Sequence, residues 1–162
     1  MLVAHAPLVQ GRIGLITLDP RITAAFEPHA APPTVRLAQA AELIGAHVAI
    51  EARIDPILPG LTDSEDCFDS LCAALARIGV RTIAASVLFL RPAVIGALRR
   101  HIADKPMLRR LLDSFADRES LAIHAGDSRV SALPAAARLE IIERLKSVAS
   151  RYSLMGFDKQ IR

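Results

Sequence analysis

The chain has 162 residues, of which 52% are hydrophobic, and this supplies enough apolar side chain for the buried core of one domain. Disordered chains and small disulfide-stapled proteins are therefore excluded, while a net charge of +3 with 23% charged residues of mixed sign permits contact with nucleic acid without implying it. No uninterrupted apolar run of about 18 residues and no secretory signal is visible, and two cysteines form no disulfide framework, so we expect a cytoplasmic protein without a membrane span.

Three short apolar segments, rich in β-branched residues, predict β-strands. They cover residues 12–18, 47–54 and 81–90, so their starts are almost evenly spaced along the chain. Helical spacing of apolar residues fills both connections, over residues 34–45 and 64–78. This alternation of helix and continuously apolar strand predicts parallel strands joined by right-handed crossovers and covered by helices.

The two crossover helices carry signals for their ends and faces. Asp63 or Ser64 is the expected N-cap of the second helix, and Gly45 and Gly79 are expected to end the two helices. Arg36 is placed on the solvent side of the first helix. The residues expected to face the core are Leu37, Ala41, Ile44, Cys67, Leu71, Ala74 and Ile78.

After residue 90 the pattern becomes helical. Prolines open predicted helices over residues 92–102 and 106–115, and Pro134 opens the most periodic helix of the chain. The polar segment 118–133 is expected to be an ordered loop over the α/β layer. The inward residues of the last helix are expected to be Leu139, Ile142, Leu145, Ala149 and Tyr152.

The predicted fold class is α/β: a partial (β/α) barrel of about three parallel strands with crossover helices, followed by a C-terminal helical segment. A complete barrel has eight such units in about 250 residues. We expect residues 1–91 to form the barrel part, with residues 92–162 packed on it as a helical extension within a single structural domain. Three parallel strands cannot close into a barrel, so both sheet edges would be unpaired unless another chain, helix or segment covers them.

The second predicted strand carries charge on one face. Alternation places Glu51, Arg53 and Asp55 together on the side opposite the aliphatic residues. Unpaired charges buried under helices would be very costly, so these side chains pair with each other and with neighbouring strands, line a wet cavity, or bind a ligand. We favour a polar site, because barrels and open α/β sheets carry their sites at the carboxyl ends of the strands.

The loop over residues 55–63 reads DPILPGLTD. Two prolines fix its backbone, Gly60 permits a positive φ or a close approach, and the following helix presents free N–H groups. Such a loop either holds a carboxylate, ribose or phosphate, or is a stiff connection with an N-cap. Thr17 and Ser86 lie near the carboxyl ends of the other strands and join this candidate region, whereas Asp19 is also explained as an ordinary turn residue.

Other polar groups are weaker candidates. His29 lies in a proline-rich connection and is either a loop residue or a base. The other four histidines have no ligand spacing with Cys, Asp or Glu, so no metal site is predicted. Cys67 and Cys72 are expected to be buried thiols on one helix. Five arginines after the third strand form either a stripe that contacts phosphates or a solvated helical face: Arg91, Arg99, Arg100, Arg109 and Arg110.

Several motifs between Ile16 and Arg91 occur together. They are TLD at the end of the first strand, EP with small residues and prolines before a helix, RIDPILPGLTD after the second strand, and ASVLFLR in the third. With these motifs the stretch resembles the second half of the barrel in radical S-adenosylmethionine proteins of the spore-photolyase-like branch, which are DNA repair photolyase-like enzymes.

The resemblance implies a cofactor site. In that family a four-iron four-sulfur cluster, held by three cysteines in a C-x3-C-x2-C loop, reduces S-adenosylmethionine to a 5′-deoxyadenosyl radical. By resemblance, Thr17 would contact the ribose, Arg53 the methionyl carboxylate, and Ser86 the adenine region. The complete set of implied cofactor-binding residues is Thr17, Glu51, Arg53, Asp55, Gly60, Ser86, Leu88 and Phe89; catalytic residues are not assigned.

The chain departs from the family in its cysteines. It has no C-x3-C-x2-C motif, so the cluster is expected only in a full-length relative and is not ligated by this chain. We therefore expect the C-terminal half of a radical S-adenosylmethionine protein, inactive alone and partnered by an N-terminal barrel half. The alternative is a non-catalytic α/β interaction module that forms homo-oligomers or binds a partner through open sheet edges. Nucleic acid is a weaker candidate partner, and no membrane partner is expected.

Overall fold

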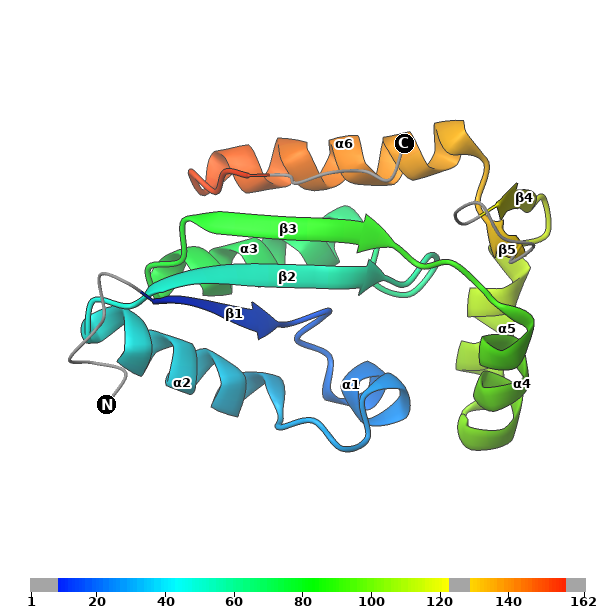
Figure 1. Ribbon diagram of the computed structural model, residues 1–162, viewed down its shortest axis with the longest axis horizontal. Coiled ribbons are helices and arrows are strands. Elements are labelled where there is room, and N and C mark those ends of the chain that lie inside the picture. Colours follow the sequence, from blue (N-terminus) through cyan, green and yellow to red (C-terminus); the bar gives the residue numbers. More distant parts are fainter. Residues whose placement is uncertain (1–8, 123–128, 157–162) are drawn as a thin grey trace.

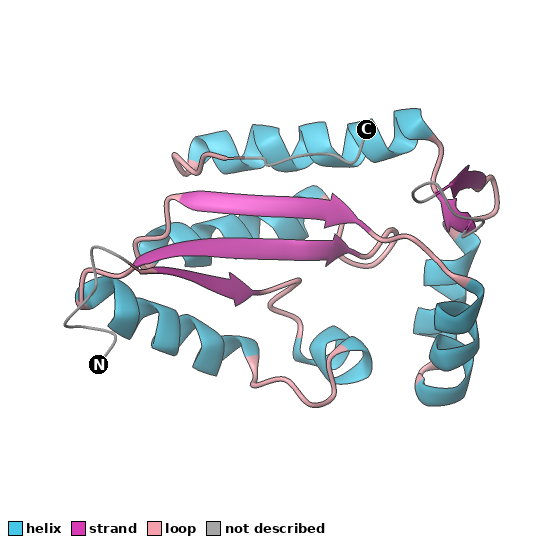
Figure 2. Cartoon of the chain, in the orientation of Figure 1, coloured by secondary structure: helices cyan, strands magenta, loops and turns pink. Residues whose placement is uncertain are grey.

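The structure is a computed structural model, and it describes residues 9–122 and 129–156. Its parallel sheet and the helices around it are drawn in Figures 1 and 2. The elements, in chain order, are β1 (Gln10–Gly14), α1 (Pro20–Phe26), α2 (Pro33–Gly45), β2 (Ala49–Ile57), α3 (Glu65–Arg77), β3 (Thr82–Val87), α4 (Pro92–His101), α5 (Lys105–Asp113), β4 (Glu119–Ala122), β5 (Arg129–Ala132) and α6 (Ala135–Arg151).

The parallel sheet has the strand order β1-β2-β3, so each crossover joins neighbouring strands. In the register, Arg12 of β1 lies opposite Glu51, and Arg53 lies opposite Ala84 of β3. Helix α3 runs behind β2 and β3, and α6 packs against both α3 and β3 (Figure 1). The predicted α/β class, with three parallel strands and crossover helices, is confirmed. A segment of a (β/α) barrel has this order, in which each strand lies beside the next strand along the chain.

The core lies between the sheet and the helices on one of its faces. Ile54 of β2, Leu75 of α3 and Leu145 of α6 have no exposed surface, and Phe68 of α3 is 1% exposed. These side chains belong to one hydrophobic cluster that also includes Leu15 after β1. The opposite face of the sheet contributes few of these residues, and it is the face on which the charged residues of β2 lie.

Helix α3 begins where its sequence signals place it. The Ser64 side chain accepts a hydrogen bond from the backbone N–H of Cys67 at 3.2 Å, and Glu65 and Asp66 occupy the first turn. Beyond the end of the helix, Gly79 has a φ of +95°, as its predicted role requires. The first crossover helix differs, because α2 ends at Gly45 and the positive φ of 63° falls on His47.

Helix α1 was not predicted. Asp19 is its N-cap and accepts a hydrogen bond from the backbone N–H of Arg21 at 2.8 Å, while Pro20 occupies the first helical position. Both residues are favoured there, so the signal was present in a segment for which no helix was predicted. The first strand also differs from its predicted range of 12–18, since it begins at Gln10 and ends at Gly14.

Three predictions for the C-terminal part are corrected or left open. The segment 118–133 is not a simple loop, since β4 and β5 pair antiparallel within it (Figure 2). In α6, Leu139 is 51% exposed and Ile141 is buried instead, because the inward stripe follows the contact with α3 and β3. The division of the chain at residue 91 stays a prediction.

The outer edge of β3 is partly covered by the chain itself. The backbone N–H of Met155 donates to the carbonyl oxygen of Arg81 at 2.9 Å, and the N–H of Ile83 donates to the carbonyl oxygen of Met155 at 2.9 Å. Thr82 and Met155 therefore form a parallel bridge. The expectation that both edges would be unpaired holds only in part. Within the described ranges, no helix has the length and apolarity needed to cross a membrane.

Candidate functional site

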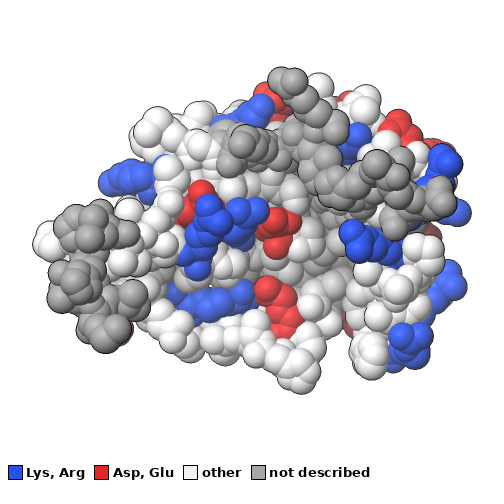
Figure 3. Space-filling view, in the orientation of Figure 1, with Lys and Arg blue, Asp and Glu red and all other residues white. Residues whose placement is uncertain are grey.

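One face of the sheet is open to solvent and carries a row of charged side chains. Glu51 and Arg53 of β2 are half-buried and Asp55 is exposed, while the residues between them are buried against the helices. No ribbon crosses in front of β2 and β3 in Figure 1, and charged side chains of both signs lie side by side there in Figure 3. The predicted alternation is confirmed, and these residues are not buried under helices.

The charged side chains form a continuous network across the three strands. Glu51 Oε1 lies 3.2 Å from Arg12 Nε and 3.6 Å from Arg53 Nη1. Arg53 Nη2 lies 3.0 Å from Asp55 Oδ2, and the Ser86 hydroxyl of β3 donates a hydrogen bond to Asp55 Oδ1. The pairing alternative for these charges is thus found in the structure, on a face that also remains accessible to a ligand.

One acceptor in this network is incompletely used. Glu51 Oε1 is buried and accepts no hydrogen bond from the described residues, although two guanidinium groups are near it. The Arg53 side chain is 39% exposed and so can still donate to a ligand. A carboxylate beside a guanidinium that is partly exposed is the pair that a zwitterionic amino-acid group requires, since its ammonium donates and its carboxylate accepts.

A small apolar hollow of about 180 Å³ opens at the carboxyl ends of the same strands. Residues from the ends of all three strands contribute to it, together with the end of α1 and the inner side of α4. The lining residues are Ile16, Phe26, Glu27, Pro56, Leu58, Leu88, Val94 and Leu98. The hollow begins directly after Asp55 in the chain, so a polar network and an apolar recess adjoin at this end of the sheet.

Glu27 is the polar residue of this lining, and Arg36 holds it. Arg36 Nη2 donates to Glu27 Oε2 at 2.7 Å, and Arg36 Nη1 donates to the carbonyl oxygen of Gly14 at 2.7 Å. The Arg36 side chain is only 12% exposed, so its predicted place on the solvent side of the helix is wrong. The half-buried guanidinium of Arg36 is stabilised because the Glu27 carboxylate and the Gly14 carbonyl oxygen both accept hydrogen bonds from it.

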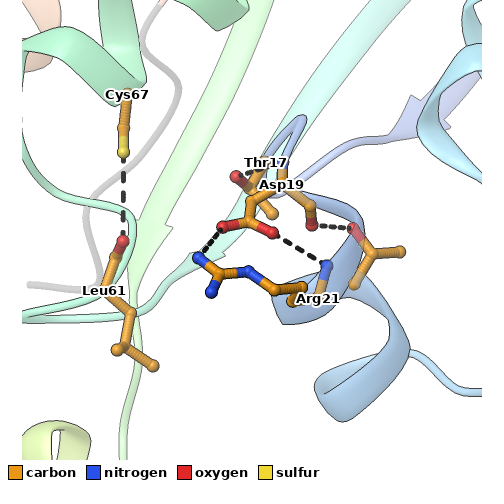
Figure 4. Close-up of polar contacts among 6 residues, drawn as sticks. Thr17, Asp19, Arg21, Leu61 and Cys67 are labelled. Carbon is orange, nitrogen blue, oxygen red and sulfur yellow. Dashed lines mark hydrogen bonds and ion pairs between the residues drawn. The ribbon is translucent and has the colours of Figure 1, made fainter. Parts of the chain in front are cut away.

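Thr17 lies apart from the charged network. It is not at a strand end, because β1 ends three residues earlier, and its side chain is 5% exposed. Its hydroxyl oxygen accepts a hydrogen bond from the backbone N–H of Asp19 at 3.1 Å (Figure 4). The Asp19 carboxylate in turn accepts from the side chain of Arg21, which lowers the pKa of Asp19. A contact between Thr17 and ribose stays a prediction.

Gly60 has both properties predicted for it, but they serve packing against α5. Its φ is +74°, and a β-carbon there would lie 2.5 Å from Ser114 Oγ and 3.3 Å from the carbonyl oxygen of Arg110. Its backbone N–H donates to Asp63 Oδ1 at 2.9 Å, so the loop closes on itself. The loop therefore has the stiff, self-bonded form that was one of its two predicted alternatives, and ligand binding by Gly60 stays a prediction.

The remaining predicted residues lie after β3. Leu88 lines the apolar hollow, and its backbone N–H donates to the carbonyl oxygen of Ile57 at 3.0 Å. Phe89 is half-buried and lies outside that lining. Two neighbours of the site were not predicted: Arg12, which the strand register places opposite Glu51, and Glu27. The charge of Arg12 at the start of the first predicted strand and the EP motif were the available signals.

The two cysteines do not fit a four-iron four-sulfur cluster. Both lie on α3, on the side of the sheet opposite the charged network, and Cys72 has no exposed surface. Burial, with a smaller effect of Asp69, raises the pKa of the Cys72 thiol to about 11. Cys67 Sγ lies 3.9 Å from the carbonyl oxygen of Leu61 (Figure 4). Across the described ranges no group of three His, Cys, Asp or Glu side chains is placed to hold a metal ion.

Comparisons with known proteins identify the architecture. No family model and no curated protein matches the sequence. Solved structures of spore photoproduct lyase do match: one variant with a TM-score of 0.73, another with 0.72, each at 17% identity, and the complex with dinucleoside spore photoproduct with 0.70 at 16% identity. Each alignment covers 91% of this chain and 43% of the lyase chain, so this chain spans less than half the length of the lyase. The chain therefore has the fold of part of spore photoproduct lyase, and the resemblance found in its sequence is confirmed at the level of fold.

Proposed function

We propose that this chain is the cofactor-side part of a radical S-adenosylmethionine barrel, and that a separate polypeptide segment holds the iron-sulfur cluster. The observation that carries the proposal is the open face of β2, where a charged network leads to an apolar hollow at the carboxyl ends of the strands. The fold shared with spore photoproduct lyase supports it, since 43% coverage of the lyase leaves room for another barrel segment.

The charged residues suit the polar end of S-adenosylmethionine. Arg53 would bind the methionyl carboxylate, because its guanidinium is 39% exposed and offers paired N–H donors. Glu51 would supply the negative charge that pairs with the α-ammonium group. These two side chains already lie 3.6 Å apart, so they would recognise the carboxylate and the ammonium of one amino acid together.

The carboxyl edge suits the nucleoside end. Asp55 and Ser86 present a carboxylate and a hydroxyl beside each other. Both would accept from the hydroxyl groups of a ribose. Leu88 and the other apolar residues of the hollow would cover a flat base and exclude water. When bound and reduced, S-adenosylmethionine supplies hydrogen-abstracting chemistry; this chain would orient it and shield it from water.

Titration calorimetry tests the proposal with S-adenosylmethionine and, as a second probe, S-adenosylhomocysteine, which has no sulfonium charge. Arg53→Gln should weaken binding by about tenfold or more, because a charge-assisted contact is lost. Arg12→Gln is the matched control: it removes a guanidinium from the same face and the same Glu51 partner at the other end of the sheet, and it should change affinity by less than about threefold.

Two results would overturn the proposal. The first is absence of binding for both probes when a cluster-bearing barrel segment is also present. The second is an equal loss in Arg12→Gln and Arg53→Gln, which would indicate general charge attraction.

A non-catalytic interaction module is the second candidate, and one observation favours it. Met155 covers part of the β3 edge, but no described segment pairs with the outer edge of β1. An unpaired edge strand offers N–H and C=O groups to a strand of another chain. Light scattering distinguishes the candidates, since dimers that persist without S-adenosylmethionine and resist its addition would favour the module.

A further inference from the structure

A second hollow lies between α4, α5 and β5, away from the charged face of the sheet. Its volume is about 400 Å³, which is within the range of about 300–1,000 Å³ found for small-molecule sites. The residues that line it are Leu90, Pro92, Ile95, Arg99, Leu112, Phe115, Arg118 and Ser131. We propose that this hollow binds a small phosphate monoester whose organic part is apolar.

The apolar walls are held firmly in place. Leu90 and Ser131 exchange two backbone hydrogen bonds of 2.8 Å, which fix the end of the β3 connection to β5. Leu90 and Phe115 are each 2% exposed and belong to the hydrophobic core, so the core packing holds these two lining residues. An apolar body of a ligand would therefore meet a preformed surface, and preformed sites bind at a smaller entropic cost.

The charged residues of this lining are both arginines. Arg99 at the end of α4 and Arg118 after α5 contribute two guanidinium groups, and among the described residues the lining contains no Asp or Glu. Neither side chain has an ion pair or hydrogen-bond partner in the described part of the chain, whereas Arg36, Arg53 and Arg151 each bind a carboxylate. Basic residues gather on the side of the molecule that carries α4 and α5 (Figure 3).

Two guanidinium groups favour a phosphate over a carboxylate. Each forms parallel hydrogen bonds with two oxygens, and a phosphate monoester brings three terminal oxygens with nearly two negative charges. Ser131 adds a hydroxyl that can donate to the same group. A single carboxylate would leave one guanidinium without a counter-charge. The chemistry of the lining thus specifies a charged phosphate head on an apolar body.

Fluorescence titration with 1-naphthyl phosphate tests the proposal. The chain holds no tryptophan, so the naphthyl emission can be measured with little protein background. The probe should bind at least about tenfold more tightly than 1-naphthol, which lacks the phosphate, and than inorganic phosphate, which lacks the apolar body. 1-Naphthoate should bind at least about tenfold more weakly than 1-naphthyl phosphate, and equal binding of the two would overturn the preference for a phosphate.

Matched variants locate the binding. Arg99→Gln and Arg118→Gln should each weaken the probe by about tenfold, because each removes one charge-assisted contact. Arg100→Gln changes the next residue on α4, which is exposed and lies outside the lining, and should leave affinity within about twofold. All three positions are exposed, and circular dichroism confirms that the variants remain folded.

Equal binding of 1-naphthol and 1-naphthyl phosphate would overturn the phosphate site. So would an equal loss in Arg100→Gln, because the effect would then be general charge. A single-stranded oligonucleotide that binds with steep salt dependence, while the naphthyl probe does not bind, would assign these arginines to a nucleic-acid surface and also overturn the proposal.

Discussion

The guanidinium of Arg36 lies against the carboxylate of Glu27, with 2.7 Å between Nη2 and Oε2. Through this ion pair α2 holds the end of α1, and a second hydrogen bond from Arg36 to Gly14 holds the end of β1. The two side chains are 12% and 26% exposed, so little water competes with the contact. This residue pair therefore fixes one wall of the apolar hollow at the carboxyl edge.

We expect Arg36→Met to lower the free energy of unfolding by about 3 kcal/mol, because the substitution leaves a largely buried carboxylate without its partner. The matched control is Arg21→Met, whose ion pair with Asp19 involves an arginine side chain that is 82% exposed. That variant should change stability by less than about 0.5 kcal/mol. Urea unfolding measures both, and equal effects would contradict the role given to Arg36.

Gly60→Ala is expected to destabilise the chain by about 2 kcal/mol. A β-carbon at this position meets Ser114 Oγ, and the positive φ is strained for any side chain. Gly45→Ala is the control, because nothing lies within 4 Å of its added β-carbon and the position is helical. It should be neutral or stabilise by about 0.5 kcal/mol.

The double variant Gly60→Ala/Ser114→Ala separates the two causes at this position. It removes the contact with Ser114 Oγ and keeps the backbone strain and the approach to the carbonyl oxygen of Arg110, so it should recover part of the lost stability. Recovery of the full wild-type value would show that the φ of Gly60 imposes no strain, and an undiminished loss would show that Ser114 is not the obstacle. Thermal unfolding of Gly60→Ala, Gly45→Ala and the double variant measures these differences.

Cys72 should make stability depend on pH in the alkaline range. Its thiol pKa is raised from 9.0 to about 11, so the folded chain holds this proton more tightly than the unfolded chain. The contribution of Cys72 to the free energy of unfolding should therefore be constant below pH 9 and fall as the pH rises from 9 towards 11. The cause is that a buried thiolate is poorly solvated.

Cys72→Ala isolates this contribution. Other groups titrate in the same range, including Tyr152, whose pKa is raised by its hydrogen bond to Asp69, but they are common to both proteins. Between about pH 8 and pH 10 the wild type should lose about 1 kcal/mol more than Cys72→Ala. Parallel pH profiles, measured by urea unfolding, would show that Cys72 does not titrate in this way.

The sequence predicted the sheet and the crossover helices because their signals are local. In β2 the alternation of Ile50, Ala52 and Ile54 with charged residues fixes both the strand and its faces. In α3 the N-cap Ser64 and the closing Gly79 mark the ends. In these elements the local propensity, the hydrophobic pattern and the packing all favour the same structure, and such agreement makes a local prediction reliable.

The errors arose where tertiary contacts decide which residues of an element are buried. Leu139 fits a helical stripe, but the contact of α6 with α3 and β3 selects a stripe that contains Ile141. Arg36 fits a solvent face, yet Glu27 from a separate helix makes it a buried partner. Strands of four residues, as in β4 and β5, carry too few alternating positions to be distinguished from a loop.

The candidate site was predicted where its residues lie on neighbouring strands and was missed where a loop contacts a distant helix. Glu51, Arg53 and Asp55 are neighbours along one strand, so alternation alone brings them together, and Ser86 follows from the pairing of parallel strand ends. Gly60 was also expected there, but it packs against α5. A loop has no repeating register, and its contact with a distant helix leaves no periodic signal.

The bridge between Met155 and the edge of β3 gives the last prediction. Met155→Pro removes the N–H that donates to the carbonyl oxygen of Arg81, so the short segment should detach from the strand. The N–H of Ile83, which donates to the carbonyl oxygen of Met155, should then exchange with solvent at least about tenfold faster. Hydrogen exchange measured by mass spectrometry or NMR reports this change.

Met155→Thr is the control at the same position. It keeps the backbone N–H and replaces a side chain that is 66% exposed, so protection of the Ile83 amide should be unchanged. If the proline variant also exposes a pairing edge, it should form larger species by light scattering while the threonine variant does not, because an unpaired strand edge is a site for association. Unchanged protection of Ile83 in Met155→Pro would mean that this backbone bridge does not protect the edge in solution.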